Sequence, residues 1–166
     1  GMATDIAAVL ANLLRFYDFE GKTMLSVGAG GGQLAGYGAV TRRVIAVDRD
    51  GAALAALAER AVALGIEERF VLVEDDFLAV ARRADVVLFE FALHEIPDPG
   101  AALDHARTLA PDVVVIDHAP GSPWAHATDE AEKVAASWQA VAAHGVRRRE
   151  DHDAVQRFAT HEELIR

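Results

Sequence analysis

Cysteine is absent from the 166-residue chain, and so are long apolar segments. Without cysteine there are no disulfide bonds, no thiolate metal site and no cysteine nucleophile. No apolar run approaches the ~18 residues that a membrane-spanning helix requires, and no basic-then-apolar signal segment is visible. These absences favour a cytoplasmic protein without a membrane partner.

Basic residues are scarce. The chain has 16 lysines and arginines against 26 aspartates and glutamates, which gives a formal net charge of −10. Proteins that bind phosphate backbones need a basic footprint, so this balance argues against a nucleic-acid partner. The one basic run, at 147–149, is followed at once by Glu150 and Asp151, which is typical of a solvated surface.

The chain does contain 52% hydrophobic residues, which suits one globular α/β domain. It is organised around residues 22–48. An apolar run at 24–27 ends in glycines at 28 and 30–32, as a buried strand does on entering a tight turn. Residues 33–35 have the pattern of a first helical turn, whose free N–H groups would face the loop.

A second apolar run, at 44–47, ends in Asp48, about 20 residues after the first glycine. An acid at the tip of the second strand is placed to accept hydrogen bonds from ribose hydroxyls. The two runs and the glycines between them therefore predict a nucleotide or nucleoside site.

Glycine loops of this kind occur in two large groups of proteins. The dinucleotide fingerprint G-x-G-x-x-G/A fails at Gln33 when counted from Gly28, and counted from Gly30 it ends the strand two residues early. Residues 26–32 resemble, without a shift, the x-x-G-x-G-x-G loop of class I S-adenosylmethionine (SAM) dependent methyltransferases. That family usually has Asp or Glu where this chain has Ser26.

The resemblance covers residues from roughly 20 to 120 and strengthens after a third strand at 70–73. Asp76 matches the family's acid that bonds the adenine amino group, and Phe77 matches the apolar residue beside the adenine ring. Asp75 is an alternative to Asp76, and acids at this point could instead cap the next helix. Residues 93–99 resemble the LHxxxDP segment of small-molecule methyltransferases. We expect no metal site, because Asp98 stands where the zinc motif H-E-x-x-H requires its second histidine.

The resemblance implies a set of site residues. Asp48 would hold the ribose and Phe91 would flank the cofactor through its backbone. His94, Glu95 and His118 would face the methyl acceptor, where a neutral imidazole could remove a proton, although packing or surface roles are the alternative and methyl transfer also proceeds by alignment alone. The residues expected to bind SAM, or its product S-adenosylhomocysteine, are Tyr17, Gly28, Ala29, Gly30, Gly32, Asp48, Arg49, Asp76, Phe77 and Phe91.

Five repeats of strand and helix predict an α/β, doubly wound, Rossmann-like sheet that is mostly parallel. The resemblance adds the strand order 3-2-1-4-5. We expect residues 1–20 to form a helix, as a lid or an edge-packing element, and 21–166 to form a single SAM-binding domain. The expected strands are 24–27, 44–47, 70–73, 85–91 and 113–117, and the later helices 51–64, 101–109 and 128–144.

Two further strands usually close the sheet in the resembled family, and we expect them to be missing here. Residues 155–165 have the pattern of a connector followed by an N-capped helix start. The fifth strand would then be a bare apolar edge, which soluble proteins avoid. We therefore expect either strand pairing by residues 146–158 or a homodimer at this edge.

These patterns predict a SAM-dependent methyltransferase acting on a small molecule. One alternative is a non-catalytic SAM-binding or methyltransferase-like domain, which Ser26 keeps open. The other is an NAD-dependent oxidoreductase. With only Lys22 and Lys133 in the chain, no Tyr-Lys proton donor for that chemistry is visible.

Overall fold

Three parallel strands form the sheet of the first half of the chain: β1 (Thr23–Val27), β2 (Arg43–Asp48) and β3 (Phe70–Glu74). β2 lies in the middle, and β1 and β2 are buried along most of their length because apolar side chains occupy both faces. This computed structural model describes residues 2–127, 129–152 and 156–162, and the chain forms two compact units, residues 1–85 and 86–166.

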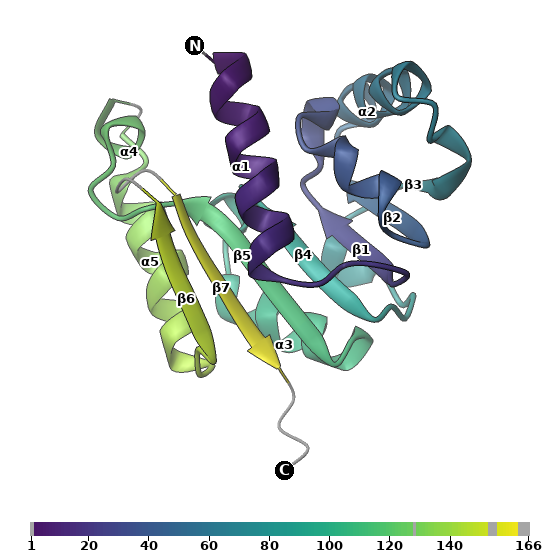
Figure 1. Cartoon of the computed structure of the whole chain (residues 1–166). Coiled ribbons are helices and arrows are strands. Elements are labelled where there is room, and N and C mark those ends of the chain that lie inside the picture. Colours follow the sequence, from purple (N-terminus) through teal and green to yellow (C-terminus); the bar gives the residue numbers. More distant parts are fainter. Residues whose placement is uncertain (1, 128, 153–155, 163–166) are drawn as a thin grey trace. The chain divides into compact units, whose positions relative to one another are not determined.

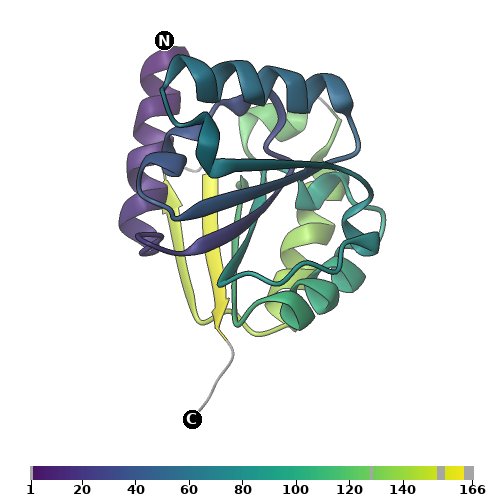
Figure 2. The ribbon, with the colours of Figure 1, turned by 90° about the vertical axis from the view of Figure 1, so that its right-hand side faces the viewer.

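Helix α2 (Gly51–Ala63) of the first unit begins and ends where the sequence predicts. The side chain of Asp50 caps it by accepting a hydrogen bond from the backbone N–H of Ala52 (2.9 Å), and Gly65 follows it at φ +71°. Its buried residues Leu54, Leu57 and Ala61 form the face that packs against β2 and β3. Figure 2 shows α2 above these strands. The unit also contains α1 (Met2–Phe16) and the short turns η3 (Glu67–Arg69) and η4 (Phe77–Ala79).

The segment after β1 differs from the expected helix start at 33–35. Two short 3₁₀ turns, η1 (Gly30–Gly32) and η2 (Ala35–Ala39), follow the strand instead. The prediction is wrong because Leu34 has φ −103° and ψ +17°, outside the range of an α-helix, so the turn that begins at Ala35 is a short 3₁₀ helix. α1 packs against η2.

The second unit contains two parallel strands, β4 (Val86–Glu90) and β5 (Asp112–His118), followed by an antiparallel pair. β7 (Gln156–Glu162) pairs with β5, and β6 (Arg148–His152) pairs with β7. Helices α3 (Pro99–Leu109) and α5 (Ala131–Ala143) lie behind these strands in Figure 1. The turn η5 (Leu93–Glu95) and the short helix α4 (Pro123–Ala127) follow β4 and β5 respectively.

The strand order of the whole sheet is β3-β2-β1-β4-β5-β7-β6. The predicted Rossmann-like α/β sheet with order 3-2-1-4-5 is confirmed. The prediction that the last two strands are missing is wrong, because β6 and β7 complete the sheet. The expected helix start falls on β7 as far as its residues are described, and residues 155 and 163–165 lie outside the described part.

The edge of β5 is covered by strand pairing, as expected, but the strand that covers it spans 156–162 rather than 146–158. The helix expected at 128–144 begins at Ala131, and Thr128 lies outside the described residues. None of the described helices is both long enough and apolar enough to span a membrane.

Candidate functional site

The glycine loop of the first unit leaves the carboxyl end of β1. Gly28 takes φ +81° and donates a backbone hydrogen bond to the carbonyl of Val47 in β2 (3.2 Å), which fixes the loop to the neighbouring strand. Gly32 is held tightly as well, since a Cβ there would lie 2.9 Å from the Cβ of Arg60 in α2. The loop therefore needs glycine at 28 for its turn and at 32 for packing.

Asp48 ends β2 beside this loop. It is half-buried, and its Oδ1 accepts a hydrogen bond from the backbone N–H of Asp50 (2.9 Å). A Cβ on Gly30 would lie 3.7 Å from the other carboxylate oxygen, Oδ2. The structure thus brings Asp48 to the glycine loop, with one oxygen turned toward Gly30.

The acid expected to bind adenine follows β3, the strand next to β2. Asp76 accepts a hydrogen bond from the backbone N–H of Leu78 (2.9 Å) and so caps η4. Its Oδ2 also lies 4.0 Å from Nη1 of Arg49, with both side chains exposed. The backbone of Asp75 is tied to Asp48, because its N–H donates to the Asp48 carbonyl (3.1 Å).

Asp48, Arg49 and Asp76, the residues after β2 and β3 that we expected to bind the methyl donor, therefore lie close together. Phe77 beside them is buried. The capping role of Asp76 was the alternative expected from sequence. The cap uses Oδ1 of Asp76, which accepts from Leu78. The other oxygen, Oδ2, takes no part in the cap and lies 4.0 Å from Nη1 of Arg49.

Tyr17, which we expected to bind the methyl donor, lies away from the glycine loop. Its buried ring accepts a hydrogen bond at the hydroxyl from Nζ of Lys22 (3.1 Å), and Lys22 precedes β1 at the strand's amino end. The glycine loop leaves the other end of the same strand. Ser26, where the resembled family has an acid, is fully buried with its hydroxyl 3.1 Å from the hydroxyl of Tyr37.

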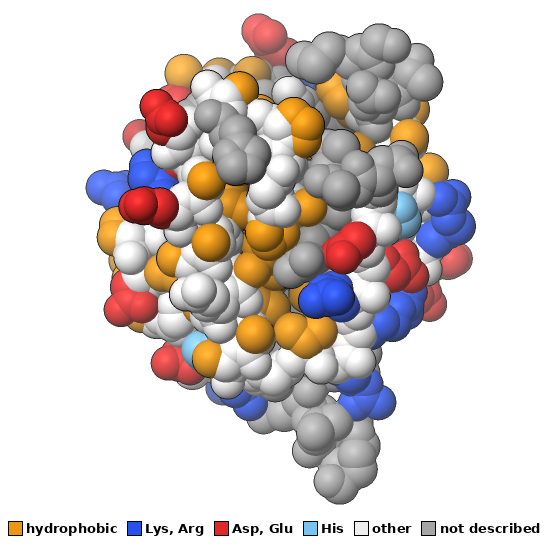
Figure 3. All heavy atoms as spheres, turned by 90° about the vertical axis from the view of Figure 1, so that its left-hand side faces the viewer, with side chains coloured by type: hydrophobic (Ala, Val, Ile, Leu, Met, Phe, Trp, Pro, Cys, Tyr) orange, Lys and Arg blue, Asp and Glu red, His pale blue; other side chains and the backbone are white. Residues whose placement is uncertain are grey.

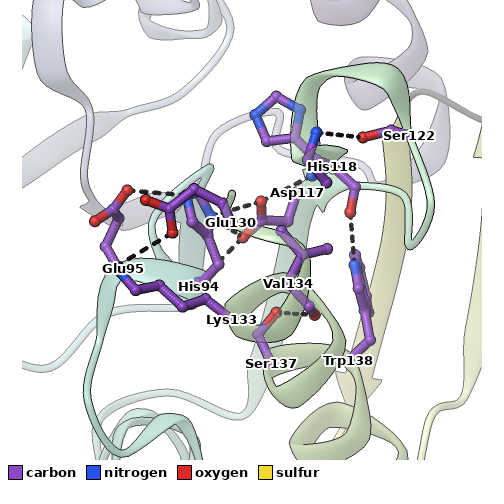
Figure 4. Close-up of polar contacts among 11 residues, drawn as sticks. His94, Glu95, Asp117, His118, Ser122, Glu130, Lys133, Val134, Ser137 and Trp138 are labelled. Carbon is purple, nitrogen blue, oxygen red and sulfur yellow. Dashed lines mark hydrogen bonds and ion pairs between the residues drawn. The ribbon is translucent and has the colours of Figure 1, made fainter. Parts of the chain in front are cut away.

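In the second unit, a buried carboxylate and an imidazole form a pair at the carboxyl end of β5. Asp117 has a fully buried side chain, and its two oxygens lie 2.8 and 2.9 Å from Nδ1 of His94 in η5. The backbone N–H groups of His94 and His118 also donate to this carboxylate (3.3 and 2.8 Å). Nε2 of His94 lies 3.0 Å from Oε1 of Glu95. Figure 4 shows the His94 ring directed at Asp117.

The two carboxylates determine the charge of His94. Burial by itself lowers the pKa of His94, but the hydrogen bond and negative charge of Asp117, together with those of Glu95, outweigh burial and raise the pKa above its ordinary value of 6.5. His94 is therefore biased toward the imidazolium form, in which both ring nitrogens donate. Neither nitrogen is free in this arrangement.

His118 lies among aromatic rings. Its ring stacks on Trp124 of α4, with centroids 3.8 Å apart and an interplanar angle of 10°, and Phe91 lies 4.9 Å away. Phe91 has φ +50°, a left-handed conformation that costs a bulky residue free energy and recurs at functional sites. Burial is the largest influence on His118 and lowers its pKa; the charge of Asp117 acts in the opposite direction, and the smaller effect of His94 lowers the pKa further.

The sequence predicted His94, Glu95 and His118 on loops after strands. His94 and Glu95 do follow β4, in η5, but His118 is the last residue of β5 itself. The structure brings all three together with Phe91. Sequence reasoning did not single out Asp117 or Trp124 as site residues. Asp117 had a signal, since it is an acid at the carboxyl end of an apolar strand, as Asp48 is. Trp124 had none beyond its place in a loop with two prolines.

Comparisons with known proteins identify the family to which this chain belongs. The family model of a methyltransferase domain matches residues 2–161. The fold and the glycine loop define a class I methyltransferase domain, and the chain belongs to the methyltransferase domain family. The prediction of a SAM-dependent methyltransferase is confirmed at the level of the family. None of the curated protein sequences compared with the chain matches it.

Solved structures share this fold along nearly the whole chain. A SAM-dependent methyltransferase from Aquifex aeolicus is 17% identical, with 95% of this chain and 96% of that chain covered and a TM-score of 0.73. Magnesium protoporphyrin IX methyltransferase from Synechocystis, with bound S-adenosylhomocysteine, is 14% identical, with 96% and 82% covered and a TM-score of 0.68. A putative RNA methyltransferase from Pyrococcus horikoshii is 21% identical, with 98% and 85% covered and a TM-score of 0.65.

Proposed function

We propose that this methyltransferase uses SAM to methylate a small-molecule acceptor. In this proposal the glycine loop, Asp48, Asp76 and Phe77 of the first unit hold the methyl donor. Residues after β4 and β5 of the second unit, among them His94, Glu95 and His118, face the acceptor. Residues 21–166 would form the SAM-binding domain, with α1 as a lid or edge helix.

One observation carries the donor half of the proposal. The half-buried carboxylate of Asp48 is held beside the glycine loop, with one oxygen fixed by the backbone of Asp50 and the other turned toward Gly30. A carboxylate fixed in this way at the tip of the second strand suits a ribose diol, which donates two hydrogen bonds. The charge of SAM, a sulfonium cation, is also compatible with acids at 48 and 76.

Two features of the second unit support a small acceptor. Phe91, His118 and Trp124 form an aromatic group, the ring of His94 lies 5.3 Å from that of Trp124, and Glu95 next to His94 is exposed. Aromatic rings with a few polar groups are typical of small-molecule sites. Secondly, the charged strand β6 is not a basic patch, because Arg148 pairs with Glu150 (3.3 Å) and Arg149 lies 3.9 Å from Asp151. Figure 3 shows acidic and basic side chains interleaved on this face.

Calorimetric titration with SAM, S-adenosylhomocysteine and NAD tests the donor half directly. We expect SAM and S-adenosylhomocysteine to bind with dissociation constants in the micromolar range and NAD to produce no heat of binding. Binding of NAD in preference to SAM would contradict the proposal. Tight binding of SAM without methyl transfer to any small molecule or RNA would instead favour the non-catalytic alternative.

A further inference from the structure

The cluster at η5 and β5 has two histidines, and the geometry assigns neither of them as the group that takes a proton from the acceptor. His94 has Nδ1 at 2.8 Å from Asp117 and Nε2 at 3.0 Å from Glu95. Its side chain is only 3% exposed. An imidazole with both nitrogens bonded to carboxylates has no free lone pair, so an acceptor cannot pass its proton to His94 directly.

His118 is unsuitable for a different reason. Its Nδ1 is buried and, among the described residues, has no hydrogen-bond partner. A buried N–H without an acceptor is rarer and costlier than a buried lone pair, so Nδ1 is bare and the ring proton resides on Nε2. A further proton would have to enter at the partnerless Nδ1. The ring is also fixed against Trp124 at 3.8 Å, and in Figure 4 it points away from Asp117. His118 is therefore a neutral N–H donor.

Glu95 is the remaining polar end of the cluster. Its side chain is 59% exposed, whereas the side chain of Asp117 is fully buried. One carboxylate oxygen, Oε1, contacts His94, and the second oxygen is available on the exposed side. The three residues thus form a chain from a buried carboxylate, through an imidazolium, to an exposed carboxylate. Figure 4 draws this chain with the ion pair (3.2 Å) between Glu130, which precedes α5, and Lys133 of α5, the helix that packs on η5.

We propose that Glu95 is the catalytic residue that contacts the acceptor, and that His94 and Asp117 are positioning residues that hold its carboxylate in place. Such an end group selects a nucleophile that donates a hydrogen bond and carries no negative charge, namely an amine or a hydroxyl. Carboxylate and phosphate acceptors are disfavoured because the three carboxylates of this cluster, Asp117, Glu95 and Glu130, outnumber the two cations, His94 and Lys133. This inference rests on the proposed function.

The chemical step balances with these groups. The acceptor nitrogen or oxygen forms a bond to the methyl carbon of the donor, and the bond from that carbon to sulfur breaks with its electron pair left on sulfur as a neutral thioether. The proton of the acceptor N–H or O–H passes to the free oxygen of Glu95 and from there to water. His94 stays protonated throughout and keeps Oε1 in place.

Nitrogen-15 NMR of the histidine side chains tests the arrangement without an acceptor. In the full chain near neutral pH we expect His94 to be protonated on both nitrogens and His118 to be neutral, with its proton on Nε2. Asp117→Asn should lower the pKa of His94. Asp104→Asn is the matched control, since it removes the carboxylate of another histidine pair, Asp104 with His144 (2.7 Å), and should leave His94 unchanged. A neutral His94 with a bare Nε2 would overturn the proposal, because His94 itself would then be the base.

A second measurement uses benzylamine, 4-methylphenol and benzoate as probes of the acceptor class. We expect the amine or the phenol to shift the side-chain NMR signals of Glu95 and His94 in wild type and not in Glu95→Gln, and whichever does so identifies the nitrogen or oxygen class. Binding of benzoate at Glu95, or no response to either neutral or cationic probe, would overturn the assignment. Failure of SAM to bind in the calorimetric titration would sink the proposed function, but the histidine readout would remain valid.

With the probe that responds, Glu95→Gln should lower kcat by about 10²–10⁴-fold, the scale of losing a general base. Asp117→Asn should lower it by roughly 10–100-fold, as loss of an orienting group does. The KM for SAM should stay within about threefold in both variants, because neither residue belongs to the donor half. If kcat falls and the KM for SAM rises by similar factors in both variants, Glu95 and Asp117 have only a structural role. The catalytic role of Glu95 would then be withdrawn.

Discussion

Asp48 is the single residue on which donor binding depends most. One of its oxygens is already bonded to the backbone of Asp50, and the other is turned to the glycine loop. Asp48→Ala should weaken SAM binding by roughly 1–3 kcal/mol, the scale of losing a hydrogen bond to a charged group. Calorimetry on the variant measures this, and circular dichroism checks the fold. Glu59→Ala, an exposed acid on α2, is the matched control. Unchanged affinity in Asp48→Ala would remove Asp48 from the site.

His94 and Asp117 make a pH-dependent contribution to stability. The folded-state pKa of His94 is raised above the ordinary 6.5, so the stabilisation is complete below that pH and is lost as the pH rises through the folded-state pKa. Asp117→Asn, which removes the buried charge, should cost roughly 1.5–3 kcal/mol of unfolding free energy at low pH. The cost should shrink at alkaline pH. Urea unfolding of both proteins across pH measures the difference, and a cost independent of pH would contradict the imidazolium.

Single residues show where sequence reasoning succeeded and where it stopped. His94 and Glu95 were identifiable because a two-proline loop after a buried strand marks a ligand-binding edge. The sequence could not show which nitrogen of His94 bonds to which carboxylate. Asp117 lies 23 residues further along the chain and contacts His94 only in the folded structure. The protonation of His94 depends on that meeting, so no local pattern could supply it.

At the scale of elements, the glycine loop and α2 depend on each other. Gly31 and Gly32 both have positive φ, but a Cβ meets nothing within 4 Å at Gly31, whereas at Gly32 it lies 2.9 Å from the Cβ of Arg60 and 3.1 Å from the Cα of Leu57. Alanine at either position therefore strains the backbone, and only Gly32→Ala also pushes α2 away. Gly32→Ala should cost roughly 1–3 kcal/mol more unfolding free energy than Gly31→Ala. Equal costs in urea unfolding would show that packing on α2 is unimportant.

The two C-terminal strands protect β5. Because β4 and β7 pair with β5 on its two sides, the amides of Val113 to Ile116 should exchange slowly with solvent. The amides of β6 should exchange faster, since β7 is its one neighbour in the strand order. Hydrogen exchange followed by NMR measures both sets. Fast exchange along Val113 to Ile116 would mean that β7 does not stay paired in solution.

These strands also show why part of the fold escaped the sequence analysis. The five parallel strands are recognisable in the sequence because each contains a run of apolar residues, and β1, β2, β4 and β5 are buried along most of their length. β6 reads Arg-Arg-Glu-Asp-His, with no apolar alternation, and becomes a strand only by pairing with β7. Its charges suit an edge, where they discourage pairing with another chain. The expected homodimer rested on a bare β5 edge, and β7 removes that reason for it.

At the scale of the whole molecule, the net charge of −10 disfavours RNA as the methyl acceptor. RNA binding releases counterions from contacted phosphates, so it requires basic contacts and weakens steeply with salt. Here the arginines of β6 already face Glu150 and Asp151. The full chain should therefore show no binding of single- or double-stranded RNA at low salt in a filter-binding assay, and added RNA should not increase release of S-adenosylhomocysteine. A wild-type titration with SAM in the same buffer confirms that the protein is competent. RNA-stimulated release that falls steeply with salt would contradict the small-molecule proposal and give this chain an acceptor of the same class as that named for its Pyrococcus horikoshii neighbour.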